Sequence, residues 1–476
     1  MKFFDTKQMG DILQRIEDHR RVEQFLTSSS LSLLFSFFTF LVFGGILAVY
    51  NLGIFAVFLI GTILYAGWVI LFLKKRRQLD YKYFEQAGRN RNVTYQLIGG
   101  MQEIKLQGCE QRKRWEWEDV QADLFKVNLQ SLNLQQVQQA GSITINEVKN
   151  ILITVLAATA VIHGNMTLGM MLAVQYIIGQ LNSPVEQLIQ FIYSWQDVSI
   201  SLDRMNEIHT ETNEENAEKT QNAYTDETAE GHSLTIKDLS FKYDIYSSKD
   251  ILSNINLSIP NGKVTAIVGP SGSGKTTLIK LLLGFYEPLN GNIQIGNANL
   301  NEYNLEWWRS QCGTVMQEGY LFSDTIARNI AISDDEPDIE RIRHAARVAN
   351  IADYIEALPL AYNTMIGQDG QGISQGQRQR ILIARVVYKN PMFVFLDEAT
   401  NALDANNERV ITESLSDFYK GKTVVVVAHR LSTVRNADQI VVLDEGKIVE
   451  IGTHEELTSK RGKYFALVKN QLELGN

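Results

Sequence analysis

The residues GPSGSGKT at positions 269–276 have the composition and spacing of a loop that binds phosphate. They match the pattern G-x-x-x-x-G-K-[ST], in which glycines let backbone N–H groups close around a phosphate. A β-branched run precedes the loop at 264–268 and an apolar helical run follows at 277–283, so a helix N-terminus adds positive potential. Lys275 can neutralise phosphate charge, and the Thr276 hydroxyl can ligate Mg²⁺. This strand–loop–helix context favours a phosphate site over a chance glycine-rich turn.

A second group of residues that could take part in catalysis is the pair of carboxylates Asp397 and Glu398, which follows the apolar run 393–396. In enzymes with a phosphate loop, an Asp at the end of such a strand binds Mg²⁺. The adjacent carboxylate points elsewhere and could polarise an attacking water. Taken alone, the run could equally be a strand that ends in a capping Asp, but the phosphate loop upstream favours catalysis.

The C-terminal half resembles the nucleotide-binding domain of ABC transporters, with nearly every motif in the order of that family. The sequence ISQGQR at 373–378 occupies the place of the LSGGQ signature motif that defines the family. The sequence NALD at 401–404 resembles the D-loop, and His429 follows a β-branched run as the switch histidine does. Gln375 departs from the family because it replaces the first glycine of the signature motif, so a less adaptable backbone is expected there.

The resemblance implies that the substrate is ATP, used with Mg²⁺, and it assigns roles to individual residues. Glu398 would be the general base, His429 would hold the γ-phosphate, and Gln317 would contact Mg²⁺ and water. Thr276, Gln317 and Asp397 would be the Mg²⁺ ligands. The implied ATP-binding residues are the adenine-stacking Tyr243, then Gly269, Pro270, Ser271, Gly272, Ser273, Gly274, Lys275, Thr276 and Thr277, and finally Ser374, Gly376, Gln377 and Asp404.

In this family two nucleotide-binding domains sandwich two ATP molecules between them. Ser374 and Gly376 would therefore touch the γ-phosphate held by the phosphate loop of the opposite subunit. The resemblance implies that one chain cannot build a complete site, and that its partner is a second ABC subunit in a homodimer or a heterodimer.

The N-terminal half carries two long stretches without Asp, Glu, Lys or Arg, at 27–73 and 150–185. A membrane-spanning helix needs about 20 mostly apolar residues. The first stretch predicts spans at 29–50 and 53–73 with a turn at Asn51, and the second predicts spans at 143–163 and 168–193. The basic run at 74–77 marks the cytoplasmic side of the first pair.

These patterns predict a multidomain fold, an α-helical transmembrane bundle followed by an α/β P-loop ATPase domain. The expected domains are a transmembrane domain at 1–210, an acidic linker at 211–232 and an ABC nucleotide-binding domain at 233–476. Between the two membrane blocks, the Gln- and Leu-rich segment 78–145 predicts long helices that reach into the cytoplasm. Within it, 110–115 combines charge with an aromatic residue and could either dock on a partner domain or be a solvated helix face.

Composition excludes several classes of function. The net charge of −9 gives no electrostatic support for binding nucleic acid at the level of the whole chain. The two cysteines, Cys109 and Cys312, are too few for a disulfide scaffold, a cysteine-based zinc site or an iron–sulfur cluster held by this chain alone.

The order of the two halves resembles ABC exporters, in which the membrane domain precedes the nucleotide-binding domain. The sequences FFDT at 3–6 and GDILQR at 10–15 look like the cytoplasmic loop after the second span of bacteriocin and peptide exporters. The resemblance implies a multi-pass protein of the inner membrane that exports a peptide, with the nucleotide-binding domain in the cytoplasm. It also implies that the chain begins after span two of a six-span half-transporter. An ABC protein that binds or hydrolyses ATP without autonomous transport, or an exporter of lipids or drugs, is left open.

Overall fold

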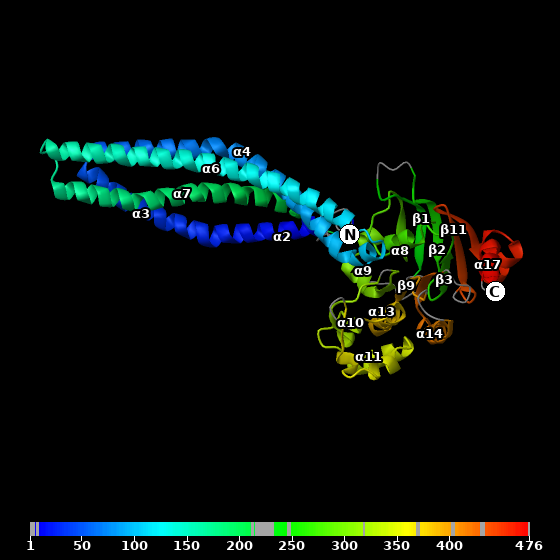
Figure 1. Ribbon diagram of the computed structural model, residues 1–476. Helices are drawn as coiled ribbons and strands as arrows, with labels where there is room; N and C mark the ends of the chain where they lie inside the picture. Colours follow the sequence, from blue (N-terminus) through cyan, green and yellow to red (C-terminus); the bar gives the residue numbers. More distant parts are fainter. Residues whose placement is uncertain are drawn as a thin grey trace. The chain divides into compact units, whose positions relative to one another are not determined.

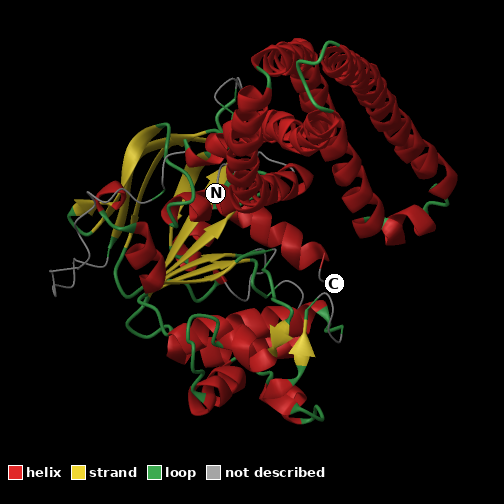
Figure 2. Cartoon of the chain, turned by 90° about the vertical axis from the view of Figure 1, so that its left-hand side faces the viewer, coloured by secondary structure: helices red, strands yellow, loops and turns green. Residues whose placement is uncertain are grey.

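The computed structural model describes residues 5, 9–210, 214, 233–244, 249–317, 319–367, 372–400, 405–428 and 434–474. The chain divides into two compact units, Lys2–Thr212 and Asn213–Asn476. All of the strands belong to the second unit, whereas the first consists of helices and their connections (Figure 2). The predicted linker lies outside the described residues apart from Glu214, as do Phe3, Phe4 and Thr6.

The first unit is built from long helices that run alongside one another, α4 along α6 and α3 along α7 (Figure 1). In chain order its elements are α2 (Met9–Gln24), the π-helix η1 (Phe25–Ser29), α3 (Ser30–Tyr50), α4 (Leu52–Gly99), α5 (Met101–Leu106), α6 (Glu110–Ile162) and α7 (Leu168–His209). Asn51 separates α3 from α4, at the predicted turn, and its side chain caps α4 by accepting a hydrogen bond from the Ile54 N–H at 3.1 Å. The segment 78–145 is helical but interrupted at Gly100 and at 107–109, where Gly108 has a φ of +58°.

Apolar side chains cover the outside of this unit as well as its core. Leu34, Phe35 and Phe38 on α3 are each about two-thirds exposed. A water-soluble protein seldom exposes so large an apolar patch, whereas a lipid environment favours it. Inside the bundle, Leu47, Phe58 and other residues of α3, α4, α6 and α7 form one apolar core.

Three of the described helices are long and apolar enough to cross a membrane, namely Asp18–Tyr50, Leu52–Gly99 and Glu110–Ile162. The fourth expected span, 168–193, lies within α7, which does not reach the same hydropathy. The reason is a series of polar residues in its apolar run, including Gln175, Gln180 and Asn182. That the segment 168–193 crosses the membrane stays a prediction.

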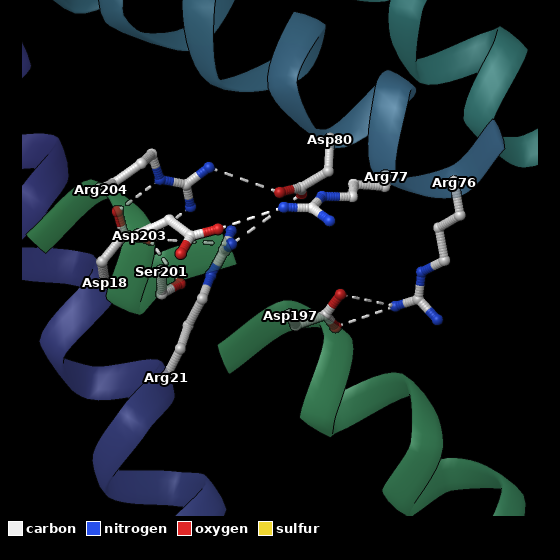
Figure 3. A network of polar contacts seen from close by, with 9 residues as sticks. All are labelled: Asp18, Arg21, Arg76, Arg77, Asp80, Asp197, Ser201, Asp203 and Arg204. Atoms are coloured by element: carbon white, nitrogen blue, oxygen red, sulfur yellow. Dashed lines mark hydrogen bonds and ion pairs between the residues drawn. The ribbon is translucent and has the colours of Figure 1, made fainter. Parts of the chain in front are cut away.

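Ionic contacts join α2, α4 and α7 beyond the predicted ends of the spans (Figure 3). Arg204 of α7 donates to both carboxylate oxygens of Asp18 on α2, at 2.9 and 2.7 Å, and to Asp80 of α4 at 3.5 Å. Asp18 is fully buried and also accepts a hydrogen bond from Ser201 at 2.9 Å. A second contact joins Arg76 of α4 to Asp197 of α7 at 2.9 Å. Because Asp18 and Arg204 neutralise each other, both can be buried.

The second unit is an α/β domain with a six-stranded sheet, a four-stranded sheet and a two-stranded ribbon. Its elements are β1 (Leu234–Phe241), β2 (Leu252–Ile259), β3 (Val264–Val268), α8 (Lys275–Leu282), β4 (Asn290–Ile295), β5 (Ala298–Asn299), the 3₁₀ turn η2 (Leu300–Glu302), α9 (Leu305–Gln311), β6 (Cys312–Val315), β7 (Asp324–Thr325), α10 (Ile326–Ile330), α11 (Ile339–Val348), α12 (Ala352–Glu356), the 3₁₀ turn η3 (Ala361–Asn363), β8 (Met365–Ile366), α13 (Gln375–Lys389), β9 (Phe393–Asp397), α14 (Ala405–Phe418), β10 (Thr423–Val427), β11 (Gln439–Asp444), β12 (Lys447–Gly452), α16 (His454–Lys460) and α17 (Lys463–Leu474).

The six-stranded sheet has the order β12-β11-β3-β10-β9-β6 and is parallel except for its edge strand β12. Its five parallel strands are mostly buried on both faces, which explains their continuous apolar runs, whereas the edge strand β12 is partly exposed. One face packs on α8 and the four-stranded antiparallel sheet, and the other on the helices α10 to α14. The fold is therefore the predicted helical transmembrane region followed by an α/β domain.

Candidate active site

Among the predicted site residues that the structure describes, those of the phosphate loop, Asp397 and Gln317 lie at one edge of the six-stranded sheet, where the parallel strands end. Gly269 follows β3, Asp397 ends β9, and Gln317 lies two residues beyond β6. The residues Ile267 and Asp397 both pair with Val427 of the intervening strand β10, so these strand ends lie level with one another. In open α/β sheets, ligands bind at the carboxyl ends of the strands.

The phosphate loop depends on two glycines for its shape. A Cβ on Gly269 would lie 2.0 Å from the carbonyl oxygen of Leu443, so no larger residue fits there. Gly274 has a φ of +100° and occupies the N-cap of α8. These glycines turn the chain from β3 directly into the N-terminus of α8, whose first residue is Lys275.

Lys275 is buried beneath the loop, with 6% of its surface exposed. Its ammonium group donates hydrogen bonds to the carbonyl oxygens of Gly269 at 3.0 Å and Pro270 at 2.9 Å. Burial lowers the pKa of Lys275, while the carboxylates of Glu398 and Asp397 act in the opposite direction. The nearby Ser273 hydroxyl is buried and has no hydrogen-bond partner within the described residues. A cation and an unsatisfied hydroxyl in one loop suit an anionic ligand such as a phosphate.

Glu398 lies next to Gln317, as the predicted roles require. The Gln317 amide donates to a Glu398 carboxylate oxygen at 3.1 Å. The backbone of Glu398 has a φ of +54°, an uncommon conformation for a residue with a side chain, and its N–H donates to the Val427 carbonyl at 3.1 Å. Such local strain concentrates at functional sites because surrounding contacts must maintain it.

The residues expected to hold Mg²⁺ have the right donor chemistry. Thr276, Gln317 and Asp397 offer hydroxyl, amide and carboxylate oxygens, the hard ligands that Mg²⁺ prefers. Among the described residues, no group of three or more His, Cys, Asp or Glu side chains could hold a metal ion by itself. This donor set fits an ion bound through one carboxylate, with substrate phosphates supplying further oxygens.

Tyr243 lies beside the helix that begins with the phosphate loop. Its hydroxyl is 3.3 Å from the Thr277 hydroxyl, and its ring is 43% exposed. Tyr286 packs edge-on against this ring at a centroid distance of 5.2 Å, and the Lys280 ammonium lies 6.0 Å from it. The sequence singled out Tyr243 but not Tyr286 or Lys280, because no motif spacing links either of them to it.

The signature segment begins a different helix. Ser374 is the N-cap of α13, and it exchanges hydrogen bonds with Gln377 in a capping box, at 3.2 and 2.8 Å. Gln375 is the first residue of the α-helix, a position that does not require glycine. The departure from the family motif is therefore compatible with the local backbone. Gln379, one turn further, donates to the Glu398 carbonyl oxygen at 3.4 Å and was not singled out in the sequence.

The phosphate loop and the signature segment start helices on opposite faces of the sheet. Leu278 of α8 belongs to the apolar cluster that contains Ile267 of β3, whereas Ile381 of α13 belongs to the cluster that contains Ala266. Successive strand residues point to opposite faces. Among the described residues, no hydrogen bond or ion pair joins 374–377 to 269–277. Two other predicted site residues, Asp404 and His429, lie outside the described residues.

Comparison with known families agrees with this arrangement. Residues 252–401 match the ABC transporter family, and residues 1–185 match the family of the ABC transporter transmembrane region. The chain belongs to the ABC transporter family. Its transmembrane region precedes its nucleotide-binding region in one chain, which is the order of the exporter type.

The curated relatives of this ABC transporter chain include translocation proteins for toxins. The chain is 34% identical over 461 residues to the alpha-hemolysin translocation ATP-binding protein HlyB of Escherichia coli, and the match covers 97% of this chain and 64% of the relative. The chain is 34% identical over 479 residues to the leukotoxin translocation ATP-binding protein LktB of Mannheimia haemolytica, and the match covers 100% of this chain and 66% of the relative. The chain thus spans just under two thirds of the length of these relatives.

The fold also matches a solved structure described as a bacterial Atm1-family ABC exporter with ATP bound. The TM-score is 0.89 and the sequence identity 27%, with 98% of this chain and 81% of that chain covered. The similarity therefore extends over both units of the chain.

Proposed function

We propose that the chain is an ATP-hydrolysing exporter subunit that works as a dimer and moves a polypeptide out of the cytoplasm across the inner membrane. The observation that carries this proposal is the edge of the six-stranded sheet, where the phosphate loop lies level with Asp397 and where Glu398 contacts Gln317. A phosphate cradle beside a carboxylate that can activate water has the parts needed for hydrolysis of a nucleoside triphosphate.

In this proposal each residue at the edge has a separate task. Lys275 and the backbone N–H groups of the loop hold the β- and γ-phosphates, and Tyr243 supports the adenine. Glu398 accepts a proton from the attacking water, which Gln317 helps to orient. Thr276, Gln317 and Asp397 would hold Mg²⁺, which neutralises charge on the phosphates when bound. Asp404 and His429 are assigned their family roles at the same site.

The position of the signature segment supports the proposed dimer. Since α8 and α13 lie on opposite faces of the sheet, the N-terminus of α13 cannot serve the phosphate loop of its own chain without rearrangement of the core. A second nucleotide-binding domain could instead present its Ser374, Gly376 and Gln377 to that loop. The N-terminus of α13 carries backbone N–H groups and positive dipole potential suited to a γ-phosphate.

Polypeptide is the proposed cargo because the curated relatives are described as translocation proteins for hemolysin and leukotoxin. The direction of transport rests on the predicted topology. The basic run at 74–77 follows the second predicted span and favours a cytoplasmic position for α5 and the nucleotide-binding region.

The substitution Glu398→Gln tests the catalytic assignment. We expect ATP turnover by the purified full chain in lipid nanodiscs to fall by about 10²–10⁴-fold, because only the general base is removed. ATP binding, measured by equilibrium dialysis, should be retained. Glu413→Gln, on the exposed side of α14, is the matched control and should hydrolyse ATP as the native chain does. Unchanged turnover in Glu398→Gln would refute the assignment.

A further inference from the structure

The first unit contains a cavity of about 710 Å³ between α4, α6 and α7, far from the strand edge in sequence. This volume is in the range of sites that bind ligands. Tyr65 and Arg76 line it from α4, residues between Ser131 and Glu147 from α6, and residues between Asn182 and Tyr193 from α7. In the predicted topology all three segments lie toward the cytoplasmic ends of the spans.

The helices that line this cavity turn polar faces toward it. On α7 the polar lining residues follow the spacing of one helical face, at Asn182, Glu186, Gln190 and Tyr193. The same polar residues are among those that keep the hydropathy of α7 low. Polar groups within membrane helices are costly unless they face water, a ligand or each other, so this face marks a functional pathway.

Amide side chains dominate the lining. Seven lining residues carry one, namely Gln135, Gln138, Gln139, Asn146, Asn182, Gln187 and Gln190, and only three lining residues are aliphatic, namely Leu134, Ile143 and Val185. A lipid tail or an apolar drug is bound by mostly apolar walls. The polar composition of this cavity therefore disfavours both.

Several of these amides have unused hydrogen-bonding capacity. Within the described residues, Gln135, Gln139, Asn146 and Gln190 make no side-chain hydrogen bond, in contrast to Asn182, which accepts one from Lys149 at 3.3 Å. A primary amide both donates and accepts. It can pair with the C=O and N–H groups of any peptide backbone, whatever the side chains of the peptide are.

The charge of the cavity is negative. Glu147 and Glu186 line it and form no ion pair within the described residues, and both interact electrostatically with Lys149, a buried cation that does not line the cavity. The single basic lining residue, Arg76, is neutralised by Asp197 at 2.9 Å and lies over the Tyr193 ring at 4.5 Å. Two carboxylates against one lysine leave an excess of negative charge at the cavity, which favours neutral or basic ligands over acidic ones.

We infer that this cavity binds an extended segment of polypeptide through its backbone and selects neutral and basic segments over acidic ones. The inference deepens the proposed export function and rests on it for the direction in which the segment moves. A cavity of this volume holds a short stretch of chain rather than a folded domain. The amides supply affinity that does not depend on sequence, and the two carboxylates supply the charge preference.

The test uses the full chain in nanodiscs without nucleotide, with two fluorescent peptides of equal length as probes. One peptide repeats Gly-Ser-Lys and the other Gly-Ser-Glu, and binding is followed by fluorescence anisotropy at physiological ionic strength. We expect the lysine peptide to bind about tenfold more tightly than the glutamate peptide. Glu147→Gln combined with Glu186→Gln should abolish this preference, since both carboxylates are neutralised while their shape is kept.

The variant Gln135→Leu/Gln139→Leu should weaken binding of the lysine and glutamate peptides alike, by about tenfold. Gln136→Leu is the matched control, because Gln136 is exposed on α6 and does not line the cavity, and it should bind as the native chain does. Equal binding by the native chain and the Gln135→Leu/Gln139→Leu variant would overturn the inference. So would displacement of the lysine peptide by an apolar dye that partitions into the cavity.

Failure of the export proposal would be visible separately. ATP turnover is measured on the same preparations, and the Glu398→Gln variant should bind the lysine peptide like the native chain. Peptide binding without ATP turnover in the native chain would refute the proposed function and leave the inference standing. ATP turnover without peptide binding would do the reverse.

Discussion

Two buried cations, one in each unit, differ in the groups that surround them and therefore in the role to which they are suited. Lys275 and Arg204 are 6% and 5% exposed. Arg204 is neutralised by the carboxylates of Asp18 and Asp80 and lies over the Phe84 ring at 4.3 Å. Lys275 donates instead to two backbone carbonyls of its own loop, which are dipoles and not charges. Arg204 is thus equipped to hold helices together, and Lys275 to attract an anion.

This difference predicts that removing the two cations damages different properties. Loss of Lys275 should impair binding of the nucleotide and spare the fold. Loss of the Arg204 contacts should impair the fold of the helical unit and spare the affinity for nucleotide. The following variants test the contrast in order of expected effect.

Lys275→Ala should reduce the affinity for ATP by about a hundredfold, near 3 kcal/mol, because it removes the cation that faces the phosphates. Equilibrium dialysis with the full chain in nanodiscs measures this affinity. The thermal unfolding midpoint should change little, since the ammonium contacts only carbonyls. The control is Lys263→Ala, in an exposed pair with Asp438 at 3.0 Å, which should leave ATP binding unchanged. Normal affinity in Lys275→Ala would remove the basis of the comparison.

Asp18→Asn should destabilise the helical unit by about 3 kcal/mol, because it removes one of the two acceptor oxygens and leaves Asp80, at 3.5 Å, as the carboxylate that faces the buried Arg204 guanidinium. Thermal unfolding is followed by circular dichroism. A thiol-reactive dye is less suitable, because its signal would depend on the accessibility of the two cysteines of the chain. Affinity for ATP should be retained.

Two further variants complete this test. Asp18→Leu combined with Arg204→Met should be more stable than Asp18→Asn, because an apolar pair carries no desolvation cost. Asp203→Asn breaks the exposed contact with Arg77 at 3.1 Å (Figure 3) and should have a much smaller effect. A double variant no more stable than Asp18→Asn would show that the buried guanidinium without its partner is not what destabilises Asp18→Asn.

Phe84→Leu should give the smallest change, a loss of about 1 kcal/mol from the aromatic contact with Arg204. The same circular dichroism measurement reports it. Phe125→Leu is the control, because Phe125 is 61% exposed on α6 and should tolerate the change better. An equal loss in both variants would argue against a specific role for the Phe84 ring.

The positions of the candidate-site residues at the strand ends could be predicted from the sequence because a short, contiguous motif determines each of them. The loop 269–276 needs glycines and a lysine at fixed spacing, and strand ends bring such motifs to one edge whatever the lengths of the connections. The contact between Gln317 and Glu398 follows from this topology. The family resemblance pointed to a restricted backbone at Gln375, but a first helical residue does not need glycine.

The polar contacts of the helical unit could not be predicted in the same way. Asp18 and Arg204 are 186 residues apart, and no local pattern distinguishes them from solvated charges. The amides of α6 were visible as a Gln-rich segment, yet their common face depends on how α6 packs against α4 and α7. The polar residues of α7 are a signal that the sequence does contain, but by themselves they do not tell which of them share a face with those of α6.

The central claim is that a complete ATP site needs two copies of the nucleotide-binding region. Ser374→Asp keeps an N-cap residue on α13 but places a negative charge where a γ-phosphate is expected, and Ser374→Asn is the neutral control. The decisive measurement is ATP turnover by a differently tagged pair, isolated by two affinity steps, in which one chain carries Lys275→Ala and the other Ser374→Asp. Each variant alone should be inactive, whereas the mixed pair should regain turnover from one intact site shared between the chains. A mixed pair as inactive as its parents, with the native pair active in parallel, would contradict the account.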